Sequence, residues 1–322
     1  MDYRMTRRDL LAAASAAGIA LSTTSLLQAQ EFKTKLCKAV IVGKPDEKTL
    51  EKLKAAGYDG VEASPCPVDQ AAKCREVAEK VGMKIHSVLR GWANFNGPAG
   101  ADNGMKATED ALRAAAGYGA GAVLLVPCRI GPSKENPMPM PQALEFKIEF
   151  DDKTGHVIKV AEGDNDKYEA YIKAHNHAID TSTEAVKKLI PLAEELKVVI
   201  ALENVWNNLW VQPAIFAHFV KSFNNPWVKG YFDIGNHVKY APSEQWVKAL
   251  GSNLCRCHAK DFKLKADGHG GDWANIRDGS VNWPAVRPAM EDVNFNSFLT
   301  IEGGSCSLEE HSKRLDLILA GK

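Results

Sequence analysis

The chain repeats one pattern of hydrophobic and polar positions from residue 36 onward, in which a short β-branched or apolar run is followed by a longer amphipathic stretch. Strands that alternate with helices in this way build βα units and a parallel sheet. The eight runs that we predict as strands cover residues 38–42, 60–63, 84–88, 122–126, 198–203, 229–233, 254–258 and 298–302. Eight such units predict a single-domain α/β fold, the (β/α)8 or TIM barrel.

The stretches between these runs mix apolar residues at three- and four-residue spacing with charges, which predicts amphipathic helices. Examples are residues 47–56, 70–81, 107–118, 181–196 and 243–250. Gly57, Gly82 and Gly119 follow three of them, where helix C-caps belong. A doubly wound sheet would need fewer strands and usually a GxGxxG turn after the first strand, and residues 42–45 contain no such motif.

One interval interrupts this alternation. Residues 129–166, after the fourth predicted strand, are too numerous for an ordinary βα loop. Residues 144–150 and 156–160 alternate around a turn, so we predict a hairpin on the rim of the barrel. Two roles remain open for this insertion: a lid over the substrate, or an edge used in self-association into a homo-oligomer.

The first thirty residues differ from the rest. Arg7 and Arg8 precede an Ala-rich apolar stretch over residues 12–27, which is typical of a twin-arginine export signal. This stretch is short for a membrane span, so we expect cleavage near Ala29 or Gln30 and no stable membrane insertion, with a retained anchor as the alternative. We therefore predict a signal at residues 1–30, a barrel at 31–322, and a periplasmic or otherwise exported protein.

Charge argues against one class of partner. Forty basic and forty acidic residues cancel, whereas proteins that bind nucleic acids usually present a broad positive field to the phosphates. The hydrophobic fraction of 45% is enough for a large core. We expect a small-molecule partner and no nucleic acid.

Four candidate metal ligands end four consecutive predicted strands: Glu203, Asp233, His258 and Glu302. The C-terminal ends of barrel strands converge on one pocket, so these side chains should face one another. Three carboxylates around one opening would raise one another's pKa unless a cation offsets their charge. Oxygen ligands with one imidazole suit Mn²⁺, our first choice, or Mg²⁺, and Co²⁺ or Zn²⁺ is also compatible.

Residues 201–207 (ALENVWN), 230–236 (GYFDIGN), 258–262 (HAKDF) and 278–285 (DGSVNWPA) resemble the xylose isomerase-like family of sugar isomerases and epimerases. The resemblance covers residues 36–318. It implies that the four strand-end residues bind a divalent metal, and that Glu203 and Glu302 also act as the catalytic acid/base pair. Related abasic-site endonucleases share the barrel, but they need extra histidine ligands and a basic DNA groove; nine histidines in no obvious cluster argue against them.

The residues suit this chemistry on their own. A metal chelated by a carbonyl and a neighbouring hydroxyl acidifies the C–H bond between them and stabilises an enediolate. One glutamate removes that proton, and the second returns a proton to the other face or to the adjacent carbon. We predict a metal-dependent isomerase or epimerase of an unphosphorylated ketose or keto-sugar. The alternatives are a 3-keto-glycoside lyase or hydrolase that uses the same enolate, and a non-catalytic sugar-binding barrel, which would not need both glutamates.

Four further residues near the ends of predicted strands are predicted substrate contacts: His86, Glu62, Trp206 and Lys260. The resemblance adds His237, four residues beyond Asp233, where related sugar epimerases can carry a histidine that contacts substrate. Local packing remains the alternative for His86, Glu62 and Trp206, and a surface salt bridge for Lys260. Two further expectations concern neighbouring segments. Arg256 should point into the barrel below His258, where it needs a partner, and residues 267–272 should form a solvated glycine-rich loop.

Overall fold

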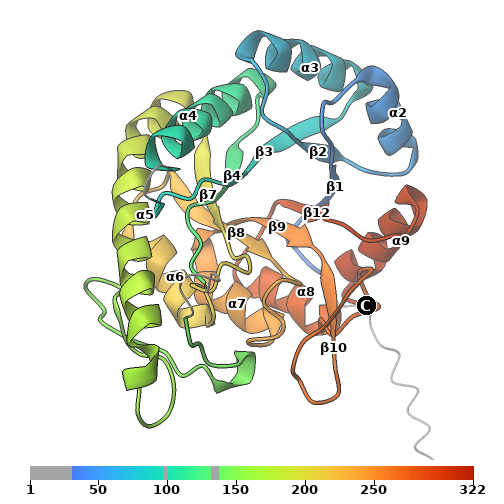
Figure 1. Ribbon diagram of the computed structural model, residues 1–322. Coiled ribbons are helices and arrows are strands. Elements are labelled where there is room, and N and C mark those ends of the chain that lie inside the picture. The colour runs from blue at the N-terminus through green and yellow to red at the C-terminus, as the bar shows by residue number, and fades with distance from the viewer. Residues whose placement is uncertain (1–30, 98–99, 132–137) are drawn as a thin grey trace, which may run out of the picture. The chain divides into compact units, whose positions relative to one another are not determined.

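The computed structural model describes residues 31–97, 100–131 and 138–322, so the predicted signal at 1–30 lies outside the described residues. Eight parallel strands close into a barrel (Figure 1), which confirms the predicted fold class. In order around the barrel they are β1 (Cys37–Ile41), β2 (Gly60–Ala63), β3 (Lys84–Trp92), β4 (Ala122–Val126), β7 (Val199–Glu203), β8 (Val228–Asp233), β9 (Leu254–Ala259) and β12 (Phe298–Ile301). The predicted strand positions agree with these within one residue, apart from β3, which extends to Trp92.

Helices surround the barrel (Figure 1). They are α2 (Glu47–Ala55), α3 (Val68–Val81), α4 (Gly100–Tyr118), α5 (Glu169–Leu196), α6 (Pro213–Ser222), α7 (Ser243–Leu250), α8 (Trp283–Asp292) and α9 (Leu308–Leu319). The start of α2 is set by Asp46, whose side chain accepts a hydrogen bond from the Thr49 N–H at 2.8 Å. The end of α3 is set by Gly82, which takes up the left-handed conformation at φ 74°.

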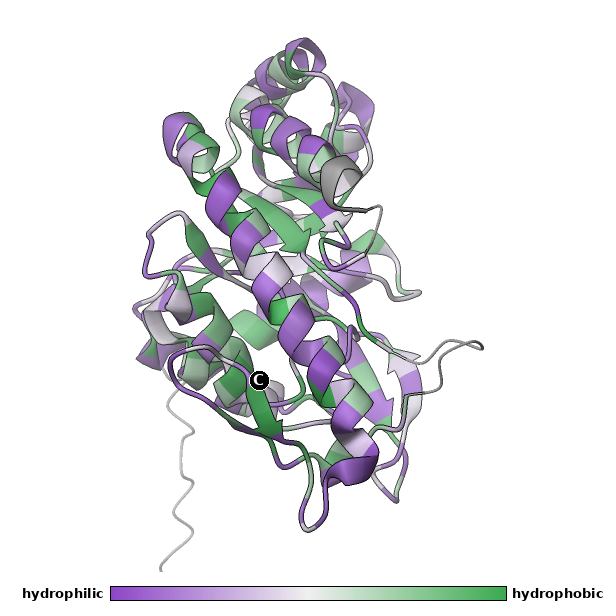
Figure 2. Cartoon of the chain, turned by 60° about the vertical axis from the view of Figure 1, so that its left-hand side comes forward, coloured by the Kyte–Doolittle hydropathy of each residue, from purple (hydrophilic) through white to green (hydrophobic). Residues whose placement is uncertain are grey.

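The longest helix, α5, begins twelve residues before its predicted start. Its buried positions recur every three or four residues, and Figure 2 shows hydrophobic and hydrophilic positions alternating along it. These positions include Tyr171, His175, Ala178, Ser182, Ala185, Leu189 and Ala193. Such spacing places one stripe of the helix against the barrel. Within the described part of the chain, no helix combines the length and the apolar character that a membrane crossing needs.

The insertion after β4 contains the predicted hairpin, although its strands are short: β5 (Glu149–Phe150) pairs with β6 (Val157–Lys159). The hairpin is attached to two helices. The Val157 N–H donates to Asn176 Oδ1 of α5 at 2.7 Å, and His218 Nε2 of α6 lies 2.9 Å from the Asp152 carbonyl oxygen. These contacts hold it beside α5 and α6. A lid and an edge for self-association both stay open for the insertion.

Before the hairpin lies a short 3₁₀ helix, η1 (Ala143–Glu145), at the C-terminal mouth of the barrel. Leu144 packs so closely against Gly268 that a Cβ there would lie 2.8 Å from Leu144 Cδ1. The ring of Phe146 lies 6.0 Å from that of Tyr240, in the segment after β8. The insertion thus contacts two other loops of the catalytic face.

A second hairpin follows β9 directly and was not predicted. β10 (Asp261–Leu264) pairs antiparallel with β11 (Gly271–Ala274), so the expected glycine-rich loop is only its turn. Asp261 anchors the base of this hairpin. Its carboxylate accepts hydrogen bonds from the backbone N–H groups of Phe262, Arg277 and Val281 and from Trp283 Nε1, at 2.9–3.1 Å. These hydrogen bonds fix the β10–β11 hairpin next to β9, the strand that carries His258.

The segment that leads into β1 is held by the end of α8. The Glu291 carboxylate accepts hydrogen bonds from the backbone N–H groups of Lys33 at 2.8 Å and Thr34 at 3.0 Å, and from the Thr34 hydroxyl. Arg287 is 2% exposed; it donates to the Thr34 carbonyl oxygen at 3.0 Å and stacks on Phe32 at 3.7 Å. This junction joins the segment before β1 to α8, the helix that leads from β9 to β12.

We predict that Glu291→Gln lowers the melting temperature at pH 7 and that the difference from wild type shrinks on acidification. Hydrogen bonds from Thr34 lower the pKa of Glu291 to about 2. A carboxyl whose pKa is lower in the folded chain stabilises it above the unfolded pKa of about 4.3, and this contribution is lost as the pH falls towards 2. Thermal unfolding at pH 7, 5 and 3 measures the effect.

Glu195→Gln is the matched control, because Glu195 is an exposed glutamate on α5. It should melt with the wild type at every pH. Equal melting temperatures for Glu291→Gln and wild type at pH 7 would show that the junction adds nothing to stability.

Candidate metal centre

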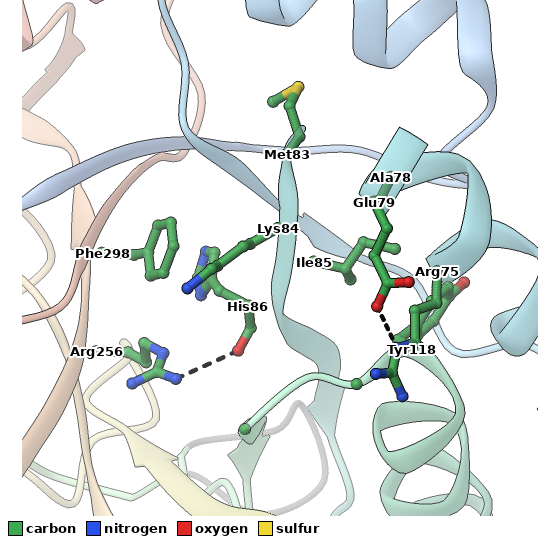
Figure 3. A pocket seen from close by; sticks show the side chains of 12 residues that line it. Arg75, Ala78, Glu79, Met83, Lys84, Ile85, His86, Tyr118, Arg256 and Phe298 are labelled. Carbon is green, nitrogen blue, oxygen red and sulfur yellow. Dashed lines mark hydrogen bonds and ion pairs between the residues drawn. The ribbon is translucent and has the colours of Figure 1, made fainter. Parts of the chain in front are cut away.

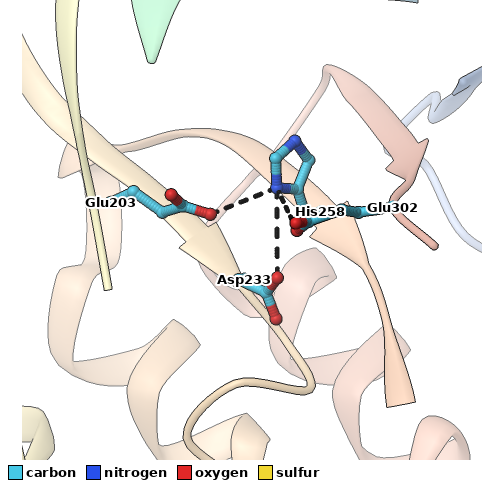
Figure 4. Close-up of side chains that lie close together, drawn as sticks. All are labelled: Glu203, Asp233, His258 and Glu302. Carbon is cyan, nitrogen blue, oxygen red and sulfur yellow. Dashed lines mark hydrogen bonds and ion pairs between the residues drawn. The ribbon is translucent and has the colours of Figure 1, made fainter. Parts of the chain in front are cut away.

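The C-terminal mouth of the barrel brings together the four side chains that the sequence places at strand ends (Figure 4). Glu203 ends β7, Asp233 ends β8, His258 lies in β9, and Glu302 follows β12. One ligand atom from each lies within 4.8 Å of the others, and we call these four residues the ligand cluster. Glu203, Asp233 and His258 are buried, whereas the Glu302 side chain is 29% exposed. The cluster therefore opens to solvent on the Glu302 side.

His258 is the centre of the ligand cluster. Its Nδ1 atom lies 3.2 Å from Glu203 Oε1, 2.9 Å from Glu302 Oε2 and 3.9 Å from Asp233 Oδ2, and in Figure 4 the three carboxylates point towards this nitrogen. Burial alone would lower the pKa of His258, but the acidic groups around it outweigh burial and raise its pKa well above the usual value. The surroundings thus favour positive charge at this point.

The carboxylates differ in their electrostatics. Burial raises the pKa of Asp233 well above its usual value, and the charge of Glu302 adds to the effect. Burial also raises the pKa of Glu203. Burial acts on Glu302 in the same direction, but His258 and Lys260 outweigh it and lower its pKa. A bound cation would stabilise all three as carboxylates.

The donor set fits a divalent cation. Asp233 is held by one oxygen, since Oδ1 accepts from the backbone N–H groups of Gly235 at 2.9 Å and Asn236 at 2.7 Å. Its other oxygen, Oδ2, is buried and has no hydrogen-bond partner among the residues that the structure describes. A buried carboxylate oxygen without a donor is costly, and a metal ion would satisfy it. Three oxygen ligands and one imidazole are a suitable set for such an ion.

Two stacked tryptophans, Trp206 and Trp273, lie beside the ligand cluster, and we call them the aromatic wall. Lys260 Nζ lies 3.2 Å from Glu302 Oε1 and 4.3 Å from the ring centroid of Trp273. Trp273 is 49% exposed and stacks on Trp206 at 4.8 Å, and the Trp206 ring also lies under Lys239 Nζ at 3.6 Å. Burial lowers the pKa of Lys239 to about 8. Of the predicted substrate contacts, Trp206 and Lys260 are therefore at the mouth.

Sequence reasoning missed Trp273 and Lys239. Trp273 reaches the mouth only because it pairs with Phe262 in the β10–β11 hairpin, a long-range contact across a glycine-rich turn. The residues next to Trp273 in the sequence show no pattern that would predict its position at the mouth of the barrel. Lys239 lies six residues beyond Asp233, where the spacing alone could have suggested a rim position.

The other three predicted contacts, Glu62, His86 and His237, lie in the protein interior. Glu62 is completely buried behind the imidazole, with Oε2 2.7 Å from His258 Nε2. His237 is 1% exposed, and its Nδ1 lies 2.9 Å from Asn204 Nδ2. His86 is 3% exposed, with Nε2 3.0 Å from Thr300 Oγ1. Each of the three side chains contacts a neighbouring strand or loop, and its role in substrate binding stays a prediction.

His86 lies at the N-terminal end of the barrel interior, at the other end from the ligand cluster. Its ring stacks on Phe298 at 4.2 Å, and both line a cavity of about 350 Å³ at the N-terminal ends of the strands (Figure 3). Arg256 also lines this cavity and finds the partners that its position required: it donates to Ser297 Oγ at 2.9 Å and to the Cys255 carbonyl oxygen at 2.8 Å. The chemistry of TIM barrels is found at the other end of the strands, where the ligand cluster lies.

Several solved protein structures share the fold of this chain. A solved xylose isomerase domain protein from Planctomyces limnophilus superposes with a TM-score of 0.64 at 12% identity, over 90% of this chain and 97% of the other. A D-tagatose 3-epimerase-like protein superposes with a TM-score of 0.62 at 16% identity (88% and 98%), and a 3-keto-D-glucoside 4-epimerase from E. coli with 0.63 at 13% identity (88% and 99%). At these identities the likeness concerns the fold. No curated protein matches by sequence.

The sequence also matches a family model described as the xylose isomerase-like TIM barrel. The match runs from residue 50 to residue 315 and so includes all four members of the ligand cluster. Because it spans most of the chain, this protein belongs to the xylose isomerase-like TIM barrel family.

Proposed function

We propose that this protein is a divalent-metal-dependent isomerase or epimerase that acts on an unphosphorylated ketose or keto-sugar. One observation carries the proposal: Glu203 and Glu302 approach the same atom, His258 Nδ1, from two different strands, at 3.2 and 2.9 Å. Two carboxylates on opposite sides of one centre are what a reaction needs that removes a proton and returns it elsewhere.

The ligand cluster would hold the metal through the oxygens of Glu203, Asp233 and Glu302 and through His258 Nδ1. When bound, a divalent ion polarises a substrate carbonyl and stabilises the negative charge that develops on deprotonation. Mn²⁺ is the ion that we propose, because the donor set is rich in oxygen with one imidazole. Asp233 serves only as a ligand, since its Oδ1 is occupied by two backbone N–H groups.

Glu203 and Glu302 carry the proton transfers in this proposal. One removes the proton from the carbon between the carbonyl and the neighbouring hydroxyl, and the other delivers a proton to the opposite face or to the adjacent carbon. Lys260 supports this by holding Glu302 Oε1 at 3.2 Å. Burial alone would lower the pKa of Lys260, but Asp233 and Glu302 outweigh burial and raise it, so the amine stays charged beside the reacting oxygens.

The substrate class rests on three supports. The exposed ring of Trp273, stacked on the partly buried Trp206, suits the apolar face of a sugar. Two structural neighbours are named as a D-tagatose 3-epimerase-like protein and a 3-keto-D-glucoside 4-epimerase. We also propose that residues 1–30 direct export by the twin-arginine route, and phosphosugars are scarce outside the cytoplasm.

Hydrogen exchange tests the reaction type. We predict that the Mn²⁺-loaded protein in D₂O incorporates deuterium next to the carbonyl of at least one ketose or 3-keto-glycoside, because an enediolate must be reprotonated. NMR of a substrate panel reads both exchange and product. Formation of an epimer or isomer supports the proposal, whereas a released aglycone would reassign the site to a lyase. A metal-loaded protein that gives neither deuterium exchange nor product with any member of the panel would contradict the enolate mechanism.

We predict that Glu302→Gln and His258→Ala separate proton transfer from metal binding. Glutamine keeps an oxygen ligand but cannot accept the proton, so turnover should fall about 10²- to 10⁴-fold, the usual contribution of a general acid or base. His258→Ala removes the central ligand and should weaken Mn²⁺ binding more than Glu302→Gln does. Steady-state kinetics and chelator competition give the two quantities.

Glu195→Gln, the exposed control on α5, should retain wild-type values in both assays. A fully active Glu302→Gln protein would exclude Glu302 from the acid/base role and leave it only a ligand.

We predict that Trp273→Ala raises KM about three- to tenfold and changes kcat less than twofold, because a stacked ring contributes about 0.5–1.5 kcal/mol of binding that the ground state and the transition state share. Trp273→Phe should restore most of the affinity. Ile158→Ala is the control, since Ile158 is more exposed than Trp273 but lies on the β5–β6 hairpin. An unchanged KM in Trp273→Ala would exclude the aromatic wall from substrate binding.

A further inference from the structure

A buried carboxylate outside the ligand cluster contacts the far side of its histidine. Glu62 lies on β2, is completely buried, and places Oε2 2.7 Å from His258 Nε2. The three carboxylates of the ligand cluster all approach the other ring nitrogen, Nδ1. The two nitrogens are on opposite sides of the imidazole, so Glu62 contacts the histidine without sharing the space in which the cluster would hold an ion.

Glu62 is itself held in place. Its second oxygen, Oε1, accepts a hydrogen bond from the Ser87 hydroxyl at 2.7 Å. Ser87 Oγ also lies 2.9 Å from His86 Nδ1, and His86 Nε2 lies 3.0 Å from Thr300 Oγ1, so the contacts continue across the barrel interior to β12. All of these groups are at most 3% exposed. Glu62 therefore has a fixed side chain with both oxygens engaged.

An irregularity in the sheet creates this contact. The pairing of β2 with β3 shifts register between Val61 and Glu62, so that Glu62 pairs with Ser87 and not with His86. Such bulges re-aim side chains. Without the shift, the serine hydroxyl would not stand beside the carboxylate.

The hydrogen-bonding capacities of these groups determine which nitrogen of a neutral His258 ring carries the proton. An ionised carboxylate accepts hydrogen bonds and donates none. When a metal ion takes the lone pair of Nδ1, the ring is neutral and carries its proton on Nε2, where the Glu62 carboxylate can accept it. Carboxylates that accept from the second nitrogen orient metal-ligating histidines in this way in many proteins.

We propose that Glu62 is a positioning residue that holds His258 as the Nε2–H tautomer and so presents Nδ1 as a metal ligand, and that Ser87 in turn holds Glu62. This inference rests on the metal centre of the proposed function. In this proposal Glu62 neither contacts the substrate nor binds the metal ion. Its role is exerted through the ring of His258.

Glu62→Gln is the informative variant. An amide has nearly the same shape, but its NH₂ group can donate to Nε2, which favours the tautomer with the proton on Nδ1. Mn²⁺ affinity, measured by chelator competition on the full-length, metal-free protein at pH 7.5, should fall about 10- to 100-fold. Glu62→Asp keeps the charge and should lose less affinity than Glu62→Gln. Glu195→Gln, on the exposed face of α5, should bind Mn²⁺ as the wild type does.

A second readout separates positioning from general structural damage. In the Zn²⁺-loaded, ¹⁵N-histidine-labelled protein, the His258 ring nitrogens should report a metal-bound Nδ1 and a protonated Nε2 in the wild type and in Glu62→Asp, and a loss of this pattern in Glu62→Gln. Ser87→Ala should lower Mn²⁺ affinity severalfold with the tautomer preserved. Ser87→Ala and Glu62→Asp carry the test if Glu62→Gln does not fold.

The outcomes are distinct. Mn²⁺ affinity within twofold of wild type in Glu62→Gln, with Nε2 still protonated, would overturn the inference and leave the proposed function intact. A wild-type protein that binds neither Mn²⁺ nor Zn²⁺ would overturn the metal centre itself and the inference with it. A 10- to 100-fold loss with the altered tautomer supports the positioning role.

Discussion

The repulsion among three carboxylates at the mouth of the barrel is the constraint on which the rest of the site depends. Barrel closure brings Glu203, Asp233 and Glu302 within 4.8 Å of one another and of His258. Two like charges about 4 Å apart repel by roughly 4 kcal/mol at an effective dielectric constant of about 20. Since a whole domain is stable by about 5–15 kcal/mol, such a cluster is destabilising unless positive charge offsets it. A cation that binds only the folded protein would therefore also stabilise the fold.

The barrel interior is organised to support this cluster. A small cluster of hydrophobic side chains fills part of the interior, and it comes from β4, β7 and β8: Ala122, Leu124, Val126, Ala201 and Tyr231. The remaining interior is polar on the side of β2, β3 and β12, where Glu62, Ser87 and Thr300 are fully buried. Buried polar groups are tolerated when they satisfy one another, as these do through a continuous series of contacts. The polar interior thus links the ligand cluster to the wall of the barrel.

The sequence predicts local features of this protein well and contacts between distant segments poorly. The strand ends that carry Glu203 and Asp233 follow from two-residue alternation, which is a local property, and the fold class follows from the count of strands. No local pattern reveals the bulge that places Glu62 opposite Ser87, so the contact of Glu62 with His258 could not be predicted. The contact between the His237 ring and the amide of Asn204, from another strand end, could not be predicted for a similar reason. Trp273 was missed because its place depends on pairing across a turn.

The two proposed acid/base residues are not equivalent, and this difference bears on the reaction. The Glu203 side chain is 8% exposed and the Glu302 side chain is 29% exposed. A proton held on Glu302 can exchange with water at the open side of the cluster, whereas a proton on Glu203 is shielded by the protein. Under the proposed function, hydrogen taken up by Glu203 would tend to return to the sugar, and hydrogen taken up by Glu302 would be replaced from solvent. The geometry of the mouth therefore makes the fate of the transferred hydrogen depend on which glutamate removes it.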